Sequence, residues 1–105
     1  MNIIIESPGF KASDALEEHI REKVGKLSRF NDRIIQAEVT LFVGPPSQAE
    51  NNHCEIRLVV PGNDLFVKKS AVAFERAVIE ACDALQKIMQ RSKDMQIGGR
   101  HDTGA

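Results

Sequence analysis

Positively charged side chains gather near the C-terminal ends of two predicted helices, where they could bind phosphate groups. The spacing of three or four residues within each group places its members along one flank of a helix. A lysine or arginine that meets a phosphate makes a charge-assisted contact and releases condensed counterions. The candidate residues are Lys23, Lys26 and Arg29 on the first helix, Arg33 just beyond it, and Lys87, Arg91 and Lys93 on the second.

The same placement of cations has a second explanation. Cations at the C-terminal end of a helix complement its macrodipole, and many helices carry them for that reason alone. The formal net charge of −1 also argues against a protein whose whole surface attracts polyanions. Phosphate binding must therefore rest on local asymmetry, and residues 14–22 are indeed net acidic whereas residues 23–33 are net basic. Spacing alone leaves both explanations open.

Motifs for catalysis and for metal binding are missing from the sequence. It contains no GxGxxG, no P-loop and no HExxH motif, and the three histidines (His19, His53 and His101) lie on different predicted elements. Cys54 and Cys82 are far apart and form no CxxC pair, so they predict two buried, reduced thiols rather than a zinc site. We expect no catalytic residues, no metal, no cofactor and no small-molecule substrate.

Length and composition are those of one small domain. The chain has 105 residues, of which 42% are hydrophobic. It has no Trp or Tyr and only five Phe, so aliphatic residues must build the core and little aromatic surface is left for stacking nucleobases. No apolar run approaches the roughly 20 residues of a membrane span, and the N-terminus lacks the pattern of a signal peptide. The expected compartment is the cytoplasm, with no membrane partner.

The first part of the chain predicts a strand, a helix and a second strand. The β-branched run at residues 2–5 ends in the turn signal SPG. A helix should begin at Ser13 or Asp14, and its apolar stripe consists of Leu16, Ile20, Val24, Leu27 and Phe30. Residues 34–43 alternate, which predicts a half-buried strand with these side chains facing the core: Ile35, Ala37, Val39, Leu41 and Val43.

The second part predicts a long hairpin, a tight turn and a second helix. Residues 44–52 are Pro-rich and polar and should form a loop before a strand that ends near residue 60. Pro61 and Gly62 suit a tight turn, which folds residues 65–69 back as a further strand. Ser70 can cap a helix that ends near Lys93, with an apolar stripe of Phe74, Val78, Ala81, Leu85, Ile88 and Met89.

This order of elements, β-α-β-β-β-α, predicts an α+β fold. We expect a two-layer sandwich in which two helices pack on one face of a four-stranded mixed sheet, with the first two strands parallel. Residues 1–95 should form a single domain. Residues 96–105 are Gly-rich and polar and predict a disordered tail.

Three segments resemble, in order and spacing, the ribosome hibernation-promoting factor family, also called the sigma-54 modulation or ribosome-associated inhibitor family. They are KVGKLSRFNDRIIQAEVTLFV, HCEIRLVVPGNDLFVKKS and AFERAVIEACDALQKIMQRSKD, and the resemblance runs over about residues 1–95. It implies the same fold and a protein that is not an enzyme. It also implies a partner, the small ribosomal subunit and its RNA, bound at the decoding channel so that idle ribosomes stay inactive.

The resemblance also carries over the basic residues of both helices as contacts to ribosomal RNA. One departure concerns the second helix, where relatives have a denser lysine and arginine run than QKIMQRSKDM, which predicts weaker RNA binding or a shifted site. The tail is too short for the second domain of long-form members, so a short-form protein is expected. A protein-interaction module that kept the fold but lost RNA binding is the alternative. Whether such a protein pairs ribosomes or only silences single ones, and its oligomeric state, stay open.

Overall fold

The computed structural model describes the backbone of residues 1–104 and the side chains of residues 1–91. Its elements follow the predicted order, with a short 3-10 turn added after the first helix. They are β1 (Asn2–Glu6), α1 (Asp14–Gly25), the 3-10 turn η1 (Lys26–Arg29), β2 (Gln36–Val43), β3 (Asn52–Val59), β4 (Leu65–Ala71) and α2 (Phe74–Gly104).

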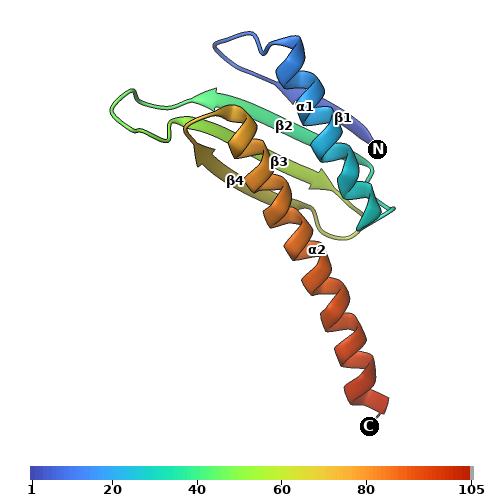
Figure 1. Ribbon diagram of the computed structural model, residues 1–105. Coiled ribbons are helices and arrows are strands. Elements are labelled where there is room, and N and C mark those ends of the chain that lie inside the picture. Colours follow the sequence, from blue (N-terminus) through green and yellow to red (C-terminus); the bar gives the residue numbers. More distant parts are fainter. Residues whose placement is uncertain (105) are drawn as a thin grey trace.

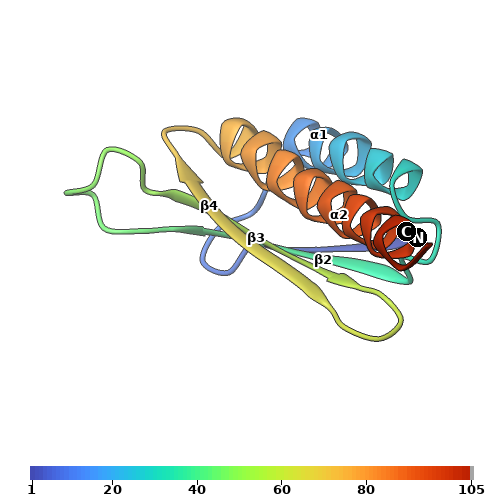
Figure 2. The same ribbon diagram turned by 90° about the horizontal axis from the view of Figure 1, so that it is seen from below.

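The four strands form one sheet in the order β1-β2-β3-β4. β1 pairs with β2 in parallel, and β3 is antiparallel to both of its neighbours. Both helices lie on the same face of this sheet and leave the other face uncovered (Figures 1 and 2). The predicted α+β two-layer sandwich is confirmed. We call the uncovered side, formed by the outward residues of all four strands, the open sheet face.

The core lies between the sheet and the two helices and is built from aliphatic side chains. The apolar stripe of the first helix is buried as predicted, with Leu16, Ile20, Val24 and Leu27 at most 7% exposed. The central strands contribute Val39, Leu41, Cys54, Ile56 and Leu58, and α2 contributes Ala77, Val78, Ala81, Cys82, Leu85 and Met89. The apolar stripes of the helices and the inward side chains of the strands therefore form one core.

Two core predictions for β2 are wrong. Ile35 and Val43, which the alternation of residues 34–43 placed inward, are 60% and 56% exposed, whereas Ile34 is buried. Ile35 precedes the strand, and its backbone N–H donates to the Val59 carbonyl oxygen at 2.9 Å. Val43 ends β2, where the hairpin runs out beyond the helices (Figure 2). The alternation in the sequence predicts which face of the sheet a side chain is on. It does not predict whether the helices extend far enough along the strand to cover that side chain.

The start of α1 agrees with the sequence. Ser13 is the N-cap, and the backbone N–H of Leu16 donates to its hydroxyl oxygen at 3.1 Å. The single helix expected to reach Phe30 instead changes at Gly25 into the tighter turn η1. The hydroxyl of Ser28 donates to the Gly25 carbonyl oxygen at 2.9 Å, which satisfies one of the carbonyl groups left free at the end of α1.

Both predicted ends of the second helix differ from the structure. Ser70 does not cap α2, because β4 continues to Ala71, paired with Asn52, and the Ser70 hydroxyl is hydrogen-bonded to the His53 imidazole. The predicted end near Lys93 is also wrong, since α2 runs to Gly104. Elongation adds one backbone hydrogen bond per residue, and this outweighs the Gly-rich composition that suggested an end. The division into a domain over residues 1–95 and a disordered tail stays a prediction.

Candidate nucleic-acid interface

The two helices lie side by side on the sheet (Figures 1 and 2). Their side chains line a shallow groove on the surface of the helix layer. Its cavity volume is ≈ 180 Å³. The apolar part of its lining consists of Leu27, Phe30, Ile79 and Cys82, and the polar part consists of Lys23, Lys26, Asp83 and Gln86. We call it the helix groove.

Lys23 and Lys26 are the two predicted cations that the structure brings to this groove. Lys23 is half-buried, and its charge acts on the Cys82 thiol across the groove. The Lys26 ammonium lies 3.5 Å from the Glu22 carboxylate, and both side chains are about half exposed, at 48% and 61%. An exposed pair of this kind contributes at most about 1 kcal/mol, so Lys26 can exchange Glu22 for a phosphate at little cost.

Arg29 ends η1 and Arg33 lies in the connection that follows it, and neither lines the groove. Both side chains are exposed. Because residues three apart eclipse each other in a 3-10 helix, Arg29 lies in line with Lys26 rather than further around the axis. The backbone N–H of Arg33 donates to the Asn31 side-chain oxygen at 2.9 Å, which fixes the turn that presents its guanidinium.

Lys87 and Arg91, the predicted cations of the second helix whose side chains are described, do not line the groove. Lys87 is exposed and follows Gln86, so it lies about 100° around α2 toward solvent. Arg91 is exposed one turn later, and the side chain of Lys93 lies outside the described residues. The structure thus places the described cations of both helices on one layer, with Lys23 and Lys26 in the groove and Lys87 and Arg91 on the neighbouring solvent face of α2.

Sequence reasoning missed two groups on the polar side of the groove, Asp83 and Gln86. Asp83 and Gln86 lie four and seven residues after Ile79, so the three side chains share one flank of α2. This spacing is the only feature of the sequence that could have indicated their place in the groove. The Gln86 amide adds a hydrogen-bond donor to the groove, and the Asp83 carboxylate adds a negative charge beside the two lysines. The groove can therefore accept a phosphate near the lysines but is not uniformly positive.

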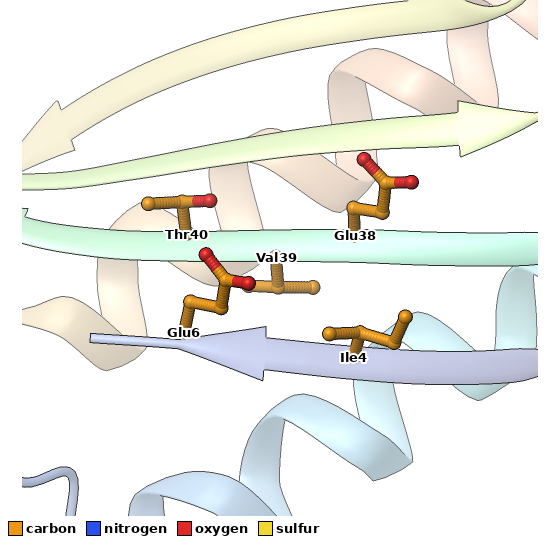
Figure 3. Close-up of a pocket in the computed structure, with 5 residues that line it drawn as sticks. All are labelled: Ile4, Glu6, Glu38, Val39 and Thr40. Carbon is orange, nitrogen blue, oxygen red and sulfur yellow. The ribbon is translucent and has the colours of Figure 1, made fainter. Parts of the chain in front are cut away.

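The open sheet face is a poorer candidate for phosphate. A shallow pocket of ≈ 260 Å³ on this face is lined by Ile4, Glu6, Glu38, Val39 and Thr40. In Figure 3 the two glutamates and Thr40 rise from β1 and β2 on the side away from the helices. The two carboxylates repel an anion at this pocket. The same face carries the cations Arg57 and Lys68, but the predicted phosphate-binding residues lie on the helix side, so we place the candidate nucleic-acid interface on the helix layer.

Lys68 and Lys69, neighbours on β4, face opposite sides of the sheet. Lys68 is on the open sheet face, where its ammonium lies 5.2 Å from the centroid of the Phe42 ring. That ring is stacked on His53 with centroids 4.8 Å apart. Lys69 is half-buried on the helix side. Of the two lysines, only Lys69 therefore lies on the same side of the sheet as the helices.

The two cysteines are free, buried thiols, as predicted. Burial raises the pKa of Cys54 to about 12, with smaller contributions from Cys82 and Glu55. The pKa of Cys82 is also raised to about 12. Burial is the largest cause, Asp83 acts in the same direction, and Lys23 acts in the opposite direction. Since the thiolate is the nucleophile and the metal ligand, neither side chain is poised for such chemistry at neutral pH.

This pair of thiols gives the protein an expected pH dependence. In the unfolded chain both thiols ionise near the ordinary cysteine pKa of 9.0, whereas in the folded protein they stay protonated to about 12. The unfolded state thus binds fewer protons in this window, and the free energy of unfolding should fall as pH rises from about 9 toward 12. Thermal unfolding at pH 8 and at pH 10 measures this loss. An equal loss in the Cys54→Ala/Cys82→Ala double variant would contradict the assignment.

Metal sites and membrane-spanning segments are the other kinds of feature that bear on function. Within residues 1–91, whose side chains are described, no three His, Cys, Asp or Glu side chains group closely enough to hold a metal ion. Among the helices in the described part of the chain, none has the length and apolar character that a membrane crossing requires.

Comparison with known proteins shows that the chain matches a protein family. Residues 3–96 match the family described as sigma 54 modulation protein / S30EA ribosomal protein. A relative in Deinococcus radiodurans, a ribosome hibernation promotion factor, is 27% identical over 93 residues, which are 88% of this chain and 49% of that protein. The chain thus spans about half the length of this relative.

Two solved structures share the fold. The N-terminal domain of Protein Y from Thermus thermophilus has a TM-score of 0.73 and 24% identity, with coverage of 87% of this chain and 98% of that one. A ribosomal subunit interface protein from Coxiella burnetii has a TM-score of 0.79 and 16% identity, with coverage of 90% and 99%. At such low identity these similarities concern the fold alone.

Proposed function

The chain belongs to the family of sigma 54 modulation proteins and S30EA ribosomal proteins, and we propose that it is a ribosome hibernation factor. It binds the small ribosomal subunit in the cytoplasm and holds it inactive without catalysing a reaction. The observation that carries the proposal is that Lys23 and Lys26 line the helix groove while Lys87 and Arg91 are exposed on the same layer of the sandwich.

The interaction rests on contacts between these cations and ribosomal RNA phosphates. Lys23 and Lys26 meet phosphates at the helix groove, while Arg29, Arg33, Lys87 and Arg91 extend the contact to either side of it. Lys93 is a further proposed contact. Charge-assisted hydrogen bonds of this kind fix position and orientation but read no sequence. A compact domain held in this way near the decoding channel excludes messenger and transfer RNA by its bulk, so inhibition needs no chemical step.

Co-sedimentation with purified small subunits over a salt series tests this function. We expect binding at low salt that weakens steeply as salt rises, because each phosphate contact releases counterions. Translation in a reconstituted system should fall as the bound fraction rises. If the protein stays in the supernatant at the lowest salt, or binds without slowing translation, the proposal is wrong.

A second candidate function is a protein-interaction module that kept the fold and lost the RNA task. The net charge of −1 and the sparse cations of the segment QKIMQRSKDM, where the family resemblance implies a denser basic run, favour it. Both candidates use the same fold, but only the first depends on the basic residues of the helix layer. Removal of those charges therefore separates the two.

A further inference from the structure

The open sheet face is polarised from one edge of the sheet to the other. In its first row, the strand register places Ile4, Glu38, Arg57 and Phe66 side by side across β1, β2, β3 and β4. In the next row, the register aligns Glu6, Thr40, Glu55 and Lys68. Paired residues of neighbouring strands point to the same side of a sheet, so both rows project from the face that the helices leave uncovered. Figure 3 shows the members of the two rows that come from β1 and β2.

Each row can complement the same row of a second copy in which the strand order runs the opposite way. A twofold axis that is parallel to the strands and passes between β2 and β3 would place β1 of one copy over β4 of the other. In the first row Ile4 then meets Phe66 of the copy, and Glu38 meets Arg57. In the second row Glu6 meets Lys68. An axis perpendicular to the strands would instead place β1 over β1. If it ran through the first row, it would oppose Glu38 to Glu38 and Arg57 to Arg57, and if it ran between the rows, it would pair Arg57 with Glu55 but leave Glu38 opposite Thr40. The parallel axis pairs more of the opposite charges, so we favour it.

Within residues 1–91, whose side chains are described, the charges that would meet across this axis form no ion pair. Arg57 and Glu38 are direct neighbours, yet among the described side chains neither forms a salt bridge within 4.0 Å. The Glu38 carboxylate instead accepts from the Gln36 side-chain amide at 2.7 Å. The flanking apolar side chains are exposed as well, Ile4 at 37% and Phe66 at 55%. The first row thus offers an anion and a cation that form no ion pair among the described side chains, together with two partly exposed apolar ends.

We propose that this face is an interface with a second copy of the same chain, packed about a twofold axis parallel to the strands. Two sheets packed face to face lie about 10 Å apart, a separation that a glutamate and an arginine can bridge together. Four short strands offer less than the roughly 800 Å² per partner of a standard interface, so the dimer is weak, with a Kd of about 10–100 μM. Both helix layers face outward, and the helix groove stays open in each copy.

Sedimentation velocity from about 10 to about 500 μM protein, a range that brackets such a Kd, tests the interface. We expect a concentration-dependent dimer in the wild type that weakens in high salt. Glu38→Arg and Arg57→Glu should each be monomeric, because each variant opposes like charges across the axis. An equimolar mixture of the two should dimerise, since the two cations of one chain then face the two anions of the other. The double swap Glu38→Arg/Arg57→Glu should dimerise alone.

The rescue in the mixture also shows that both single variants are folded. Lys87→Glu makes the same charge change as Arg57→Glu on the helix layer and should leave dimerisation intact while it weakens ribosome co-sedimentation. Arg57→Glu should do the opposite, so the interface and the proposed function can fail independently. A wild type that is monomeric over the whole range, a dimer that survives Arg57→Glu, or a mixture that stays monomeric would each overturn the interface.

Discussion

Replacement of Lys23, Lys26, Lys87 and Arg91 by glutamine is expected to weaken association with the small ribosomal subunit at least about 100-fold at low salt. Each of these residues would lose a charge-assisted contact to a phosphate, and such contacts contribute about 1.5–3 kcal/mol each when well formed. The salt dependence should also become shallower, because each lost phosphate contact lowers the slope of log K against log salt by roughly 0.7–0.9. Co-sedimentation of the variant and the wild type over one salt series measures both quantities.

A matched control separates a specific loss from a loss of net charge. The double variant Lys23→Gln/Lys26→Gln removes two cations from the helix groove, and Arg57→Gln/Lys68→Gln removes two from the open sheet face. Only the first should weaken ribosome association, and only the first should change the salt slope. An equal loss in both would indicate non-specific attraction. An unchanged quadruple variant would instead favour the protein-interaction module.

Ile56→Ala is expected to lower the free energy of unfolding by about 2–5 kcal/mol. Ile56 is fully buried in β3, a strand with neighbours on both sides, and the helices cannot collapse far enough to fill the space that the substitution leaves. Since a domain of this size has a stability of about 5–15 kcal/mol, a third or more of the total can be lost. Urea unfolding followed by circular dichroism gives the value.

Ile35→Ala is the control for this prediction, because it deletes the same atoms at another isoleucine that the sequence placed inward. Ile35 is 60% exposed, so its truncation should change the free energy of unfolding by less than about 0.5 kcal/mol. Equal losses at the two positions would mean that β2 continues inward at Ile35 and that its exposure is not the state in solution.

Periodicity alone predicted most of the fold. The stripes of both helices and the alternation in β2 gave most of the elements, the buried face and the layers, because those patterns record which side of each element avoids water. Gly62 has a φ of +96°, as the turn after Pro61 requires. The errors lie at the ends of elements. At Ile35, Val43 and Ser70 the outcome depends on how far a neighbouring layer or strand extends. The first helix changes into η1 at Gly25, and α2 continues past Lys93 to Gly104.

The candidate site divides in the same way. The sequence determined which residues are cationic and which end of the first helix presents Lys23, Lys26 and Arg29, because spacing along one helix fixes relative direction. Only the tertiary structure decided that Lys23 and Lys26 share a groove with α2 while Lys87 turns to solvent. It also decided that Glu38 lies beside Arg57 in a row bounded by Ile4 and Phe66. Those relations arise from helix packing and strand register, which join residues far apart in the chain and are set by the whole core rather than by any local pattern.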